Sequence, residues 1–299
     1  MSADEFARAL RNQGAPLFLD DAGTPTALGI EFAATTADGT AVRVTRLAPV
    51  LTAGLRDPDA FVRIVERHGY RGAGITGSWL YVVEPPPAGI PLAQRLAGEG
   101  TIPPTQLAPL AGAATAALTA HHARFGPHGL ISPSTLLVDG AGGVTLRWSG
   151  IVPGLRAAGA DLARFVEQLD VAGLLAPELE SGSDFSVRSD VYALGATFYL
   201  AATGKPPFGG RTTAGVMAAV LTEDGGASTS PARRVTSATL RAIEHDPGDR
   251  WNDARHFHDA IVGTPSPAIV PTVAKPRRWI GWAVAAVTVT ILLVWRLTH

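Results

Sequence analysis

The sequence contains no cysteine and almost no lysine, and each absence excludes a kind of chemistry. Without cysteine, the 299-residue chain has no disulfide, no thiol nucleophile and no thiolate metal ligand. Only two lysines occur, Lys205 and Lys275, so no site upstream of Lys205 can use one. The excess of arginine over lysine, with abundant Ala, Gly and Pro, is typical of a GC-rich coding bias and favours an actinobacterial source.

The chain also lacks an excess of charge of either sign. It contains 25 Lys and Arg residues and 26 Asp and Glu residues, so its net charge is −1. This charge gives no electrostatic reason to expect nucleic acid as a partner. The first residues, MSADEFARALRNQG, are polar and lack the apolar core of a secretory signal peptide. We therefore expect the region that follows them to lie in the cytoplasm.

The C-terminal end differs in composition from the rest of the chain. Residues 264–278 are rich in proline, show no periodicity and indicate an extended basic linker. The uncharged run WIGWAVAAVTVTILLVW follows, and as a helix it would span about 25 Å, at the short end of what a bilayer core needs. A buried C-terminal helix is the alternative, but the run has no polar face. We predict a transmembrane helix over residues 279–296.

The charges beside this run predict its orientation. Lys275, Arg277 and Arg278 precede it, whereas Arg296 alone follows closely. Because positive residues remain on the cytoplasmic side, the large N-terminal region should face the cytoplasm. The sequence thus predicts a single-pass protein of the plasma membrane, anchored by its tail.

The remaining chain divides into a β-rich front and a helical back. Alternating apolar residues flank an Asp38-Gly39 turn, which is typical of a hairpin, and the run WLYVVE reads as a further strand. Residues 57–69 have helical spacing. Downstream of Pro103 the pattern is helical, including a helix that we expect to have Ser189 as N-cap and to end at Gly204. We predict an N-terminal lobe over 1–100 and a C-terminal lobe over 101–263.

Three stretches, residues 174–210, 244–261 and 128–151, together resemble one family, the bacterial eukaryotic-type Ser/Thr protein kinases in their membrane-anchored form. LLAPELESGSDFSVRSDVYALGATFYLAATGKPPFGG is similar to the family's APE motif, central C-lobe helix and Gly-x-Pro-Pro-Phe turn. EHDPGDRWNDARHFHDAI is similar to its closing segment, and HGLISPSTLLVDGAGGVTLRWSGI to its catalytic and metal-binding loops. The resemblance implies an α+β, bilobal protein-kinase-like fold with a small β-rich N-lobe and a helical C-lobe, here followed by the transmembrane helix.

The resemblance assigns structural roles to four residues. Glu178 matches the glutamate of the APE motif and should pair with Arg250, the family's late arginine. Asp190 matches the aspartate that holds the backbone of the catalytic loop. His128 matches the first residue of the HRD motif, which implies packing in the core rather than chemistry.

The positions that carry chemistry in the family hold other residues here. Arg43 stands at the position of the phosphate-binding lysine, and Leu130 and Ser132 stand at those of the catalytic aspartate and its helper lysine. Thr135 and Trp148 replace the two metal ligands. Because Leu130, Ser132, Thr135 and Trp148 carry none of the charges that phosphoryl transfer needs, the resemblance predicts a pseudokinase without enzymatic activity, cofactor or metal.

Two charged residues lie near enough in the sequence to be considered as substitutes for the missing groups. Arg43 keeps a positive charge and could pair with Glu66, whereas Asp139 is expected to be a turn residue rather than a displaced metal ligand. The segment between Gly150 and Glu178 contains no Ser, Thr or Tyr, so regulatory phosphorylation is not expected there.

The leading hypothesis is therefore a scaffold or regulator in bacterial Ser/Thr phosphosignalling, acting at the cell envelope. Its expected partners are proteins: true Ser/Thr kinases, phosphothreonine-reading domains or envelope-synthesis proteins. Two alternatives remain open: a nucleotide-binding sensor without phosphotransfer, and an atypical active Ser/Thr protein kinase. The sequence does not predict the oligomeric state.

Overall fold

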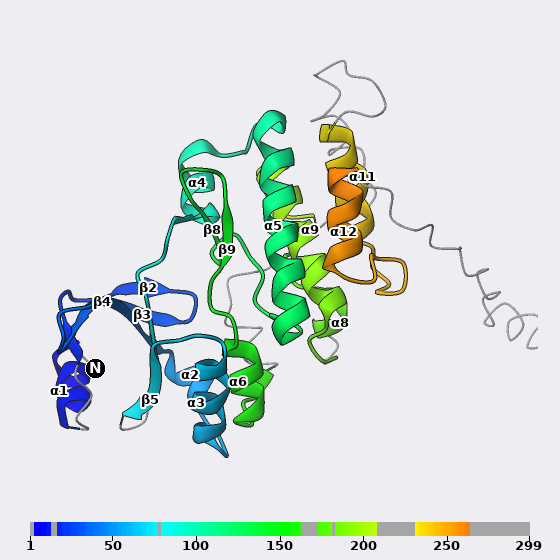
Figure 1. Cartoon of the computed structure of the whole chain (residues 1–299). Helices are drawn as coiled ribbons and strands as arrows, with labels where there is room; N and C mark the ends of the chain where they lie inside the picture. Colours follow the sequence, from blue (N-terminus) through cyan, green and yellow to red (C-terminus); the bar gives the residue numbers. More distant parts are fainter. Residues whose placement is uncertain are drawn as a thin grey trace, which may run out of the picture. The chain divides into compact units, whose positions relative to one another are not determined.

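A computed structural model describes residues 3–12, 17–76, 79–162, 173–180, 183–207 and 231–263 of the chain (Figure 1). Contacts divide the chain into two units, residues 1–264 and residues 265–299. The predicted linker and transmembrane helix lie outside the described residues. Within the ranges given above, no helix is both long enough and apolar enough to cross a membrane.

The front half is a curled antiparallel sheet. The strand order is β1 (Leu17–Leu19), β3 (Gly29–Thr36), β4 (Ala41–Leu47), β6 (Trp79–Glu84) and β5 (Gly72–Thr76), and β2 (Thr24–Thr26) pairs with the end of β3. The predicted hairpin around Asp38 and Gly39 is confirmed by β3 and β4. Gly39 has a φ of 81°, a conformation that glycine adopts without steric cost.

The sheet is covered on both faces, because successive side chains of a strand point in opposite directions. In β6, Trp79, Tyr81 and Val83 pack with Phe6 of helix α1 (Ala3–Asn12), whereas Leu80 and Val82 join a second cluster with Phe61 of α3 (Pro58–Arg67). This explains why β6 reads as a continuous apolar run. Helix α1, with buried residues Phe6 and Leu10 at helical spacing, was not predicted from the sequence.

The second cluster continues into the back half. It joins residues of the sheet and α3 to Leu130, Trp148 and the helix α6 (Ile151–Ala157). Helix α6 lies against α3 at Gly154, where a Cβ atom would lie 2.9 Å from the Phe61 ring. The two halves of this unit therefore share an apolar core.

The back half is helical around a small sheet. Its helices are α4 (Leu92–Glu99), α5 (Pro104–Phe125), α8 (Pro177–Glu180), α9 (Val187–Thr203), α11 (Pro231–Ala242) and α12 (Ala254–Val262), and its sheet has the order β7 (Ile90–Pro91), β8 (Leu136–Val138), β9 (Val144–Leu146). The short helix α2 (Pro49–Thr52) belongs to the front half. Mixed α and β structure, with a curled sheet followed by helices, agrees with the predicted fold class and is consistent with a kinase-like fold.

Helix α9 begins three residues earlier than predicted. Its N-cap is Ser186, not Ser189, and the two serines form a capping box in which each side chain bonds to the other's backbone N–H. The predicted end at Gly204 is confirmed, since this glycine has a φ of 72° and donates its N–H to the carbonyl of Leu200.

Arg250 and Glu178 form a bidentate pair beneath α9. Both bonds between the guanidinium and the carboxylate measure 2.7 Å, and the Arg250 side chain is completely buried. Arg250 also donates to the carbonyls of Glu244 and His245, and it lies 4.7 Å from the centre of the Tyr192 ring. A buried guanidinium with its donors satisfied holds three chain segments together.

Replacing Arg250 with methionine should lower the free energy of unfolding by about 3–5 kcal/mol, because it removes the buried guanidinium that binds the Glu178 carboxylate. Chemical denaturation followed by tryptophan fluorescence measures this loss. Arg63→Met is the matched control: its pair with Asp57 is exposed, so the expected loss is under about 1 kcal/mol. Equal losses in the two variants would show that the Arg250 pair does not hold the segments together.

Candidate functional site

A cavity of about 360 Å³ lies between the front sheet and the β8–β9 hairpin. Its walls include the segment Glu84–Ala88, Tyr70, Leu137, Leu146 and the consecutive residues Arg147, Trp148 and Ser149. The volume falls within the range of small-molecule pockets, about 300–1,000 Å³. The walls are mostly apolar, with a few polar groups whose partners decide what the cavity can accept.

Arg147 bridges the hairpin to two strands of the front sheet. Its Nε donates to Glu84 at 3.0 Å, and its Nη2 contacts both Glu84 and Glu31. Glu31 lies on β3 and Glu84 ends β6, so the guanidinium reaches across β4, which separates these strands. Only 8% of the Arg147 side chain is exposed. This arrangement, the Arg147 bridge, ties the two halves together by charge.

Burial and charge act in opposite directions within the Arg147 bridge. Burial raises the pKa of Glu84, and the guanidinium of Arg147 only partly offsets that rise. Burial alone would lower the pKa of Arg147, but the charges of Glu84 and Glu31 outweigh it and the pKa is raised. Arg147 is therefore fixed as a cation, whereas Glu84 depends on Arg147 to remain charged.

Arg43 joins this bridge rather than the predicted partner. Its Nε lies 4.0 Å from Glu31, while Glu66 is exposed on α3, so the predicted pair between Arg43 and Glu66 is wrong. Arg43 lies opposite Glu84 in the pairing of β4 with β6. Glu31 lies on β3, the strand next to β4, so the Arg43 side chain reaches it directly. A contact between Arg43 and Glu66 would instead require α3 to move.

The other four positions predicted to be degenerate are all buried. Leu130 and Trp148 belong to the apolar cluster shared by the two halves. The Thr135 hydroxyl accepts from the Ser132 N–H and donates to the Ser132 carbonyl, both at 2.9 Å. These two bonds fix the turn between Ser132 and Thr135. These side chains therefore act in packing and in local hydrogen bonds.

Asp139 lies where a turn residue is expected. Its carboxylate accepts from the N–H groups of Ala141 and Gly143, each at 2.8 Å, in an exposed turn between β8 and β9. Within the parts of the chain that the structure describes, no group of three or more His, Cys, Asp or Glu side chains could hold a metal ion.

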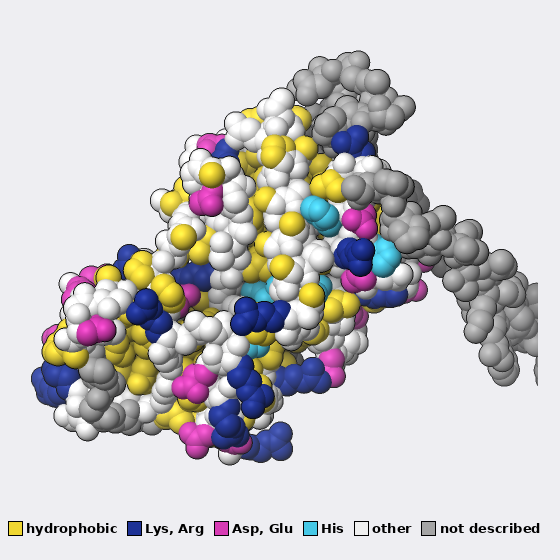
Figure 2. All heavy atoms as spheres, in the orientation of Figure 1, with side chains coloured by type: hydrophobic (Ala, Val, Ile, Leu, Met, Phe, Trp, Pro, Cys, Tyr) yellow, Lys and Arg dark blue, Asp and Glu magenta, His cyan; other side chains and the backbone are white. Residues whose placement is uncertain are grey.

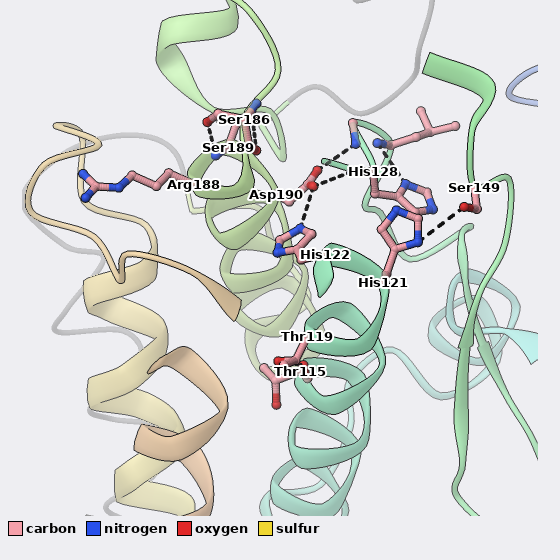
Figure 3. A network of polar contacts seen from close by, with 12 residues as sticks. Thr115, Thr119, His121, His122, His128, Ser149, Ser186, Arg188, Ser189 and Asp190 are labelled. Carbon is pink, nitrogen blue, oxygen red and sulfur yellow. Dashed lines mark hydrogen bonds and ion pairs between the residues drawn. The ribbon is translucent and has the colours of Figure 1, made fainter. Parts of the chain in front are cut away.

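Asp190 holds the loop that precedes β8. Its carboxylate accepts from the backbone N–H of His128 at 2.6 Å, from that of Gly129 at 2.8 Å and from Nε2 of His122 at 2.9 Å (Figure 3). Asp190 lies on α9 and is 2% exposed. The loop is therefore fixed from the most deeply buried helix of the back half.

His128 is fully buried and connects this loop to the Arg147 bridge. Its Nδ1 accepts from the Leu130 N–H and its Nε2 donates to the Arg147 carbonyl at 3.1 Å, which assigns the neutral tautomer with the proton on Nε2. Burial lowers the pKa of His128 to about 4. The His128 ring therefore stays neutral in the folded protein near pH 7.

Three further histidines lie beside His128. The ring centre of His121 is 4.9 Å from that of His128, and burial lowers the pKa of His121 to about 3. His122 lies next to His121 in the chain, and His68 contacts Ser149. The sequence patterns predicted neither this group nor the residues Arg147, Glu31 and Glu84. The adjacent histidines at the end of a helix were the only local signal.

Acidification should destabilise the protein through His121 and His128. Below about pH 6.5, the ordinary pKa, the unfolded chain binds protons that the folded chain does not. The free energy of unfolding should therefore fall from about pH 6.5 to about pH 4, by up to about 1.4 kcal/mol per pH unit for each histidine. His121→Phe should flatten this slope in denaturation curves, and His245→Gln, at an exposed position, should not. A slope unchanged by His121→Phe would contradict the assignment.

Loss of the Arg147 bridge should also cost stability, in a pH-dependent way. Arg147→Met leaves the mostly buried Glu84 without its cation and Glu31 with only the more distant Arg43, so we expect a loss of about 3–5 kcal/mol at pH 7. The loss should shrink as the pH falls below 7, because burial raises the pKa of Glu84 and a protonated Glu84 needs no cation. Denaturation curves at a series of pH values test this. Arg156→Met is the control, since its exposed pair with Asp184 should contribute under about 1 kcal/mol.

No family model matches the chain. It is 27% identical over 189 residues to the serine/threonine-protein kinase PknB of Mycolicibacterium smegmatis, an alignment of 61% of this chain and 30% of that protein. It is 27% identical over 164 residues to a probable serine/threonine-protein kinase of Corynebacterium efficiens, covering 52% and 25% respectively. It is 25% identical over 189 residues to PknB of Mycobacterium tuberculosis, covering 61% and 30%.

These similarities support a relation to bacterial Ser/Thr protein kinases. The alignments span less than a third of the length of these curated relatives. The prediction that the chain is not an enzyme is contradicted, because every one of these relatives is a Ser/Thr protein kinase and the similarity favours a kinase. That prediction rested on side chains at five positions. It left out the charged groups of the Arg147 bridge, of which Arg147 and Glu84 line the cavity and Glu31 contacts Arg147.

Proposed function

We propose that the chain is a regulator in bacterial Ser/Thr phosphosignalling, which binds protein partners and is held at the plasma membrane by residues 279–296. The similarity to Ser/Thr protein kinases supports the signalling role. The observation that carries the proposal is the Arg147 bridge, which together with the shared apolar core holds the two halves in one arrangement. A fixed arrangement offers a partner a constant surface.

One face of the molecule supplies a surface with suitable chemistry. Figure 2 shows basic side chains gathered over α3 and α6. The exposed arginines of this basic face, on these helices and beside them, are Arg56, Arg63, Arg67, Arg124 and Arg156. Arg63 and Arg156 pair with Asp57 and Asp184 at the surface. Because guanidinium groups bind carboxylates and phosphates in a bidentate manner, this face fits an acidic or phosphorylated segment of a partner.

The regulator proposal does not depend on whether the chain itself transfers phosphate. A protein that binds a kinase or its substrate changes phosphorylation by position and affinity, and electrostatic complementarity between the two surfaces sets the rate of encounter. Arg56 and Arg67 lie in or beside α3, which packs against both the sheet and α6. A partner on this face therefore contacts a part of the molecule that the Arg147 bridge keeps in place.

Removing the chain from its native host should change the occupancy of Ser and Thr phosphosites on other proteins, as measured by quantitative phosphoproteomics. The wild-type chain should restore the pattern, and a variant with Arg56→Glu and Arg67→Glu should not, because it reverses charge on the basic face. Arg8→Glu with Arg255→Glu is the matched control at exposed positions elsewhere. An unchanged phosphosite pattern without the chain would refute the regulator proposal, and failure of the control variant would refute the role of the face.

A nucleotide sensor is the second candidate, and the 360 Å³ cavity favours it. Ligand at one hundred times its Kd should add about 2.7 kcal/mol to the free energy of unfolding. A thermal-shift titration of the whole chain with ATP, with and without Mg²⁺, separates the outcomes. A metal-independent shift supports the sensor, a Mg²⁺-dependent shift supports an active kinase, and no shift at millimolar ATP leaves the cavity to other ligands.

A further inference from the structure

We propose that Ser149 is a nucleophilic serine, activated by His68, which accepts an acyl group from an uncharged ester bound in the cavity. The proposal is independent of the regulator role, because it concerns a hydroxyl on the cavity wall and no phosphosignalling partner. Ser149 and His68 both line the cavity of about 360 Å³.

Two histidines flank the hydroxyl of Ser149. The oxygen lies 2.7 Å from Nδ1 of His68 and 3.3 Å from Nδ1 of His121 (Figure 3 shows the latter contact). A nucleophile and a general base within about 2.6–3.2 Å are the geometric requirement for an activated serine. The pair of Ser149 with His68 meets it.

The direction of these bonds follows from the second ring nitrogen of His121. Nε2 of His121 is buried and has no hydrogen-bond partner among the described residues. A buried N–H without an acceptor is the costlier of the two tautomers, so the proton of His121 lies on Nδ1. His121 then donates to the Ser149 oxygen, and the Ser149 hydroxyl donates to Nδ1 of His68. The proton of Ser149 is thus directed at the base.

The backbone around Ser149 is constrained on both sides. Trp148 has a φ of 62°, and it is the one non-glycine residue with positive φ among those that the structure describes. Gly150 has a φ of 83°, and a Cβ atom there would lie 2.6 Å from Cγ of His68. Glycine at this position therefore permits the close approach of His68. A serine on a tight, strained turn between a strand and a helix is also the backbone arrangement of the nucleophile elbow.

His68 is held in position and is uncharged. Its ring stacks on Phe125, with ring centres 4.2 Å apart and planes inclined by 22°. Burial, together with the positive charge of Arg124, lowers the pKa of His68. The charged and titratable groups that act on His68 include Arg124 on α5, His121 and His128. Tyr70, Glu84 and Arg147 line the same cavity. A neutral imidazole at pH 7 can accept the proton from Ser149.

The residues that line the cavity indicate the class of substrate. Tyr70, Leu137 and Leu146 give it apolar and aromatic walls, and the charge of Arg147 is already matched by carboxylates. An uncharged ester with an aromatic leaving group fits such walls without displacing an ion pair. In the reaction, the Ser149 oxygen bonds to the ester carbonyl carbon while its proton passes to His68. The carbon–oxygen bond to the leaving group then breaks, and the departing phenol takes the proton. The products are O-acyl Ser149 and the phenol.

The absence of cysteine permits a direct test on the whole chain in detergent. Ser149→Cys introduces the only thiol, and its rate of alkylation by iodoacetamide reports how readily the group loses its proton. We expect it to react at least about 10-fold faster at pH 7 than Ser237→Cys, a matched variant on the exposed side of α11. Adding His68→Phe, which keeps an aromatic ring against Phe125, should abolish the difference. Equal rates in the two single variants, or no effect of His68→Phe, would overturn the proposal.

The wild-type chain provides a second, independent measurement. With p-nitrophenyl acetate, we expect a burst of one nitrophenolate per chain and an acetyl group on the peptide that contains Ser149, identified by mass spectrometry. Ser149→Ala should remove both, whereas Ser237→Ala should change neither. Acetylation spread over several serines, or none at Ser149, would show that the contacts of Ser149 are structural only. Thermal unfolding of each variant confirms that it is folded before the rates are compared.

Discussion

The buried guanidinium of Arg147 is the constraint on which the arrangement of the two halves depends. A charge removed from water is tolerated only where opposite charges and hydrogen bonds replace its hydration, and Glu31 and Glu84 supply them from two separate strands. The sheet cannot move away from the hairpin without exposing or abandoning this charge. The apolar cluster that joins Leu80 and Val82 to Trp148 also holds the sheet against the hairpin. Charge and packing together thus keep the cavity in one shape.

The anchor of this bridge lies deep in the helical half. Asp190 on α9 binds the backbone of His128, and the His128 ring in turn binds the carbonyl of Arg147. A continuous path of hydrogen bonds therefore runs from the central helix to the front sheet. The next two residues, Trp148 and Ser149, form part of the wall of the cavity. One short backbone segment thus positions the bridge, the wall and the proposed nucleophile.

Local patterns in the sequence predicted much of this fold and little of its site. The hairpin around Gly39 and the end of α9 follow from turn and cap chemistry, which neighbouring residues determine. The N-cap of α9 was misplaced because Ser186 and Ser189 both fit a capping box, and only the backbone decides between them. The Arg147 bridge joins residues 63 and 116 positions apart, and His68 lies 81 positions from Ser149. No local spacing encodes such contacts, so only the three-dimensional structure shows them.

A distance measurement between the two halves tests the central claim most directly. Cysteine variants at Ala37, in the β3–β4 turn, and at Ser237, on α11, carry one spin label each in a chain without native cysteine. Pulsed electron paramagnetic resonance then gives the distribution of the distance between them. If Arg147 fixes the two halves, the distribution is narrow in the otherwise unchanged chain and broadens in Arg147→Met. A distribution that is broad in both, or equally narrow in both, would contradict the account.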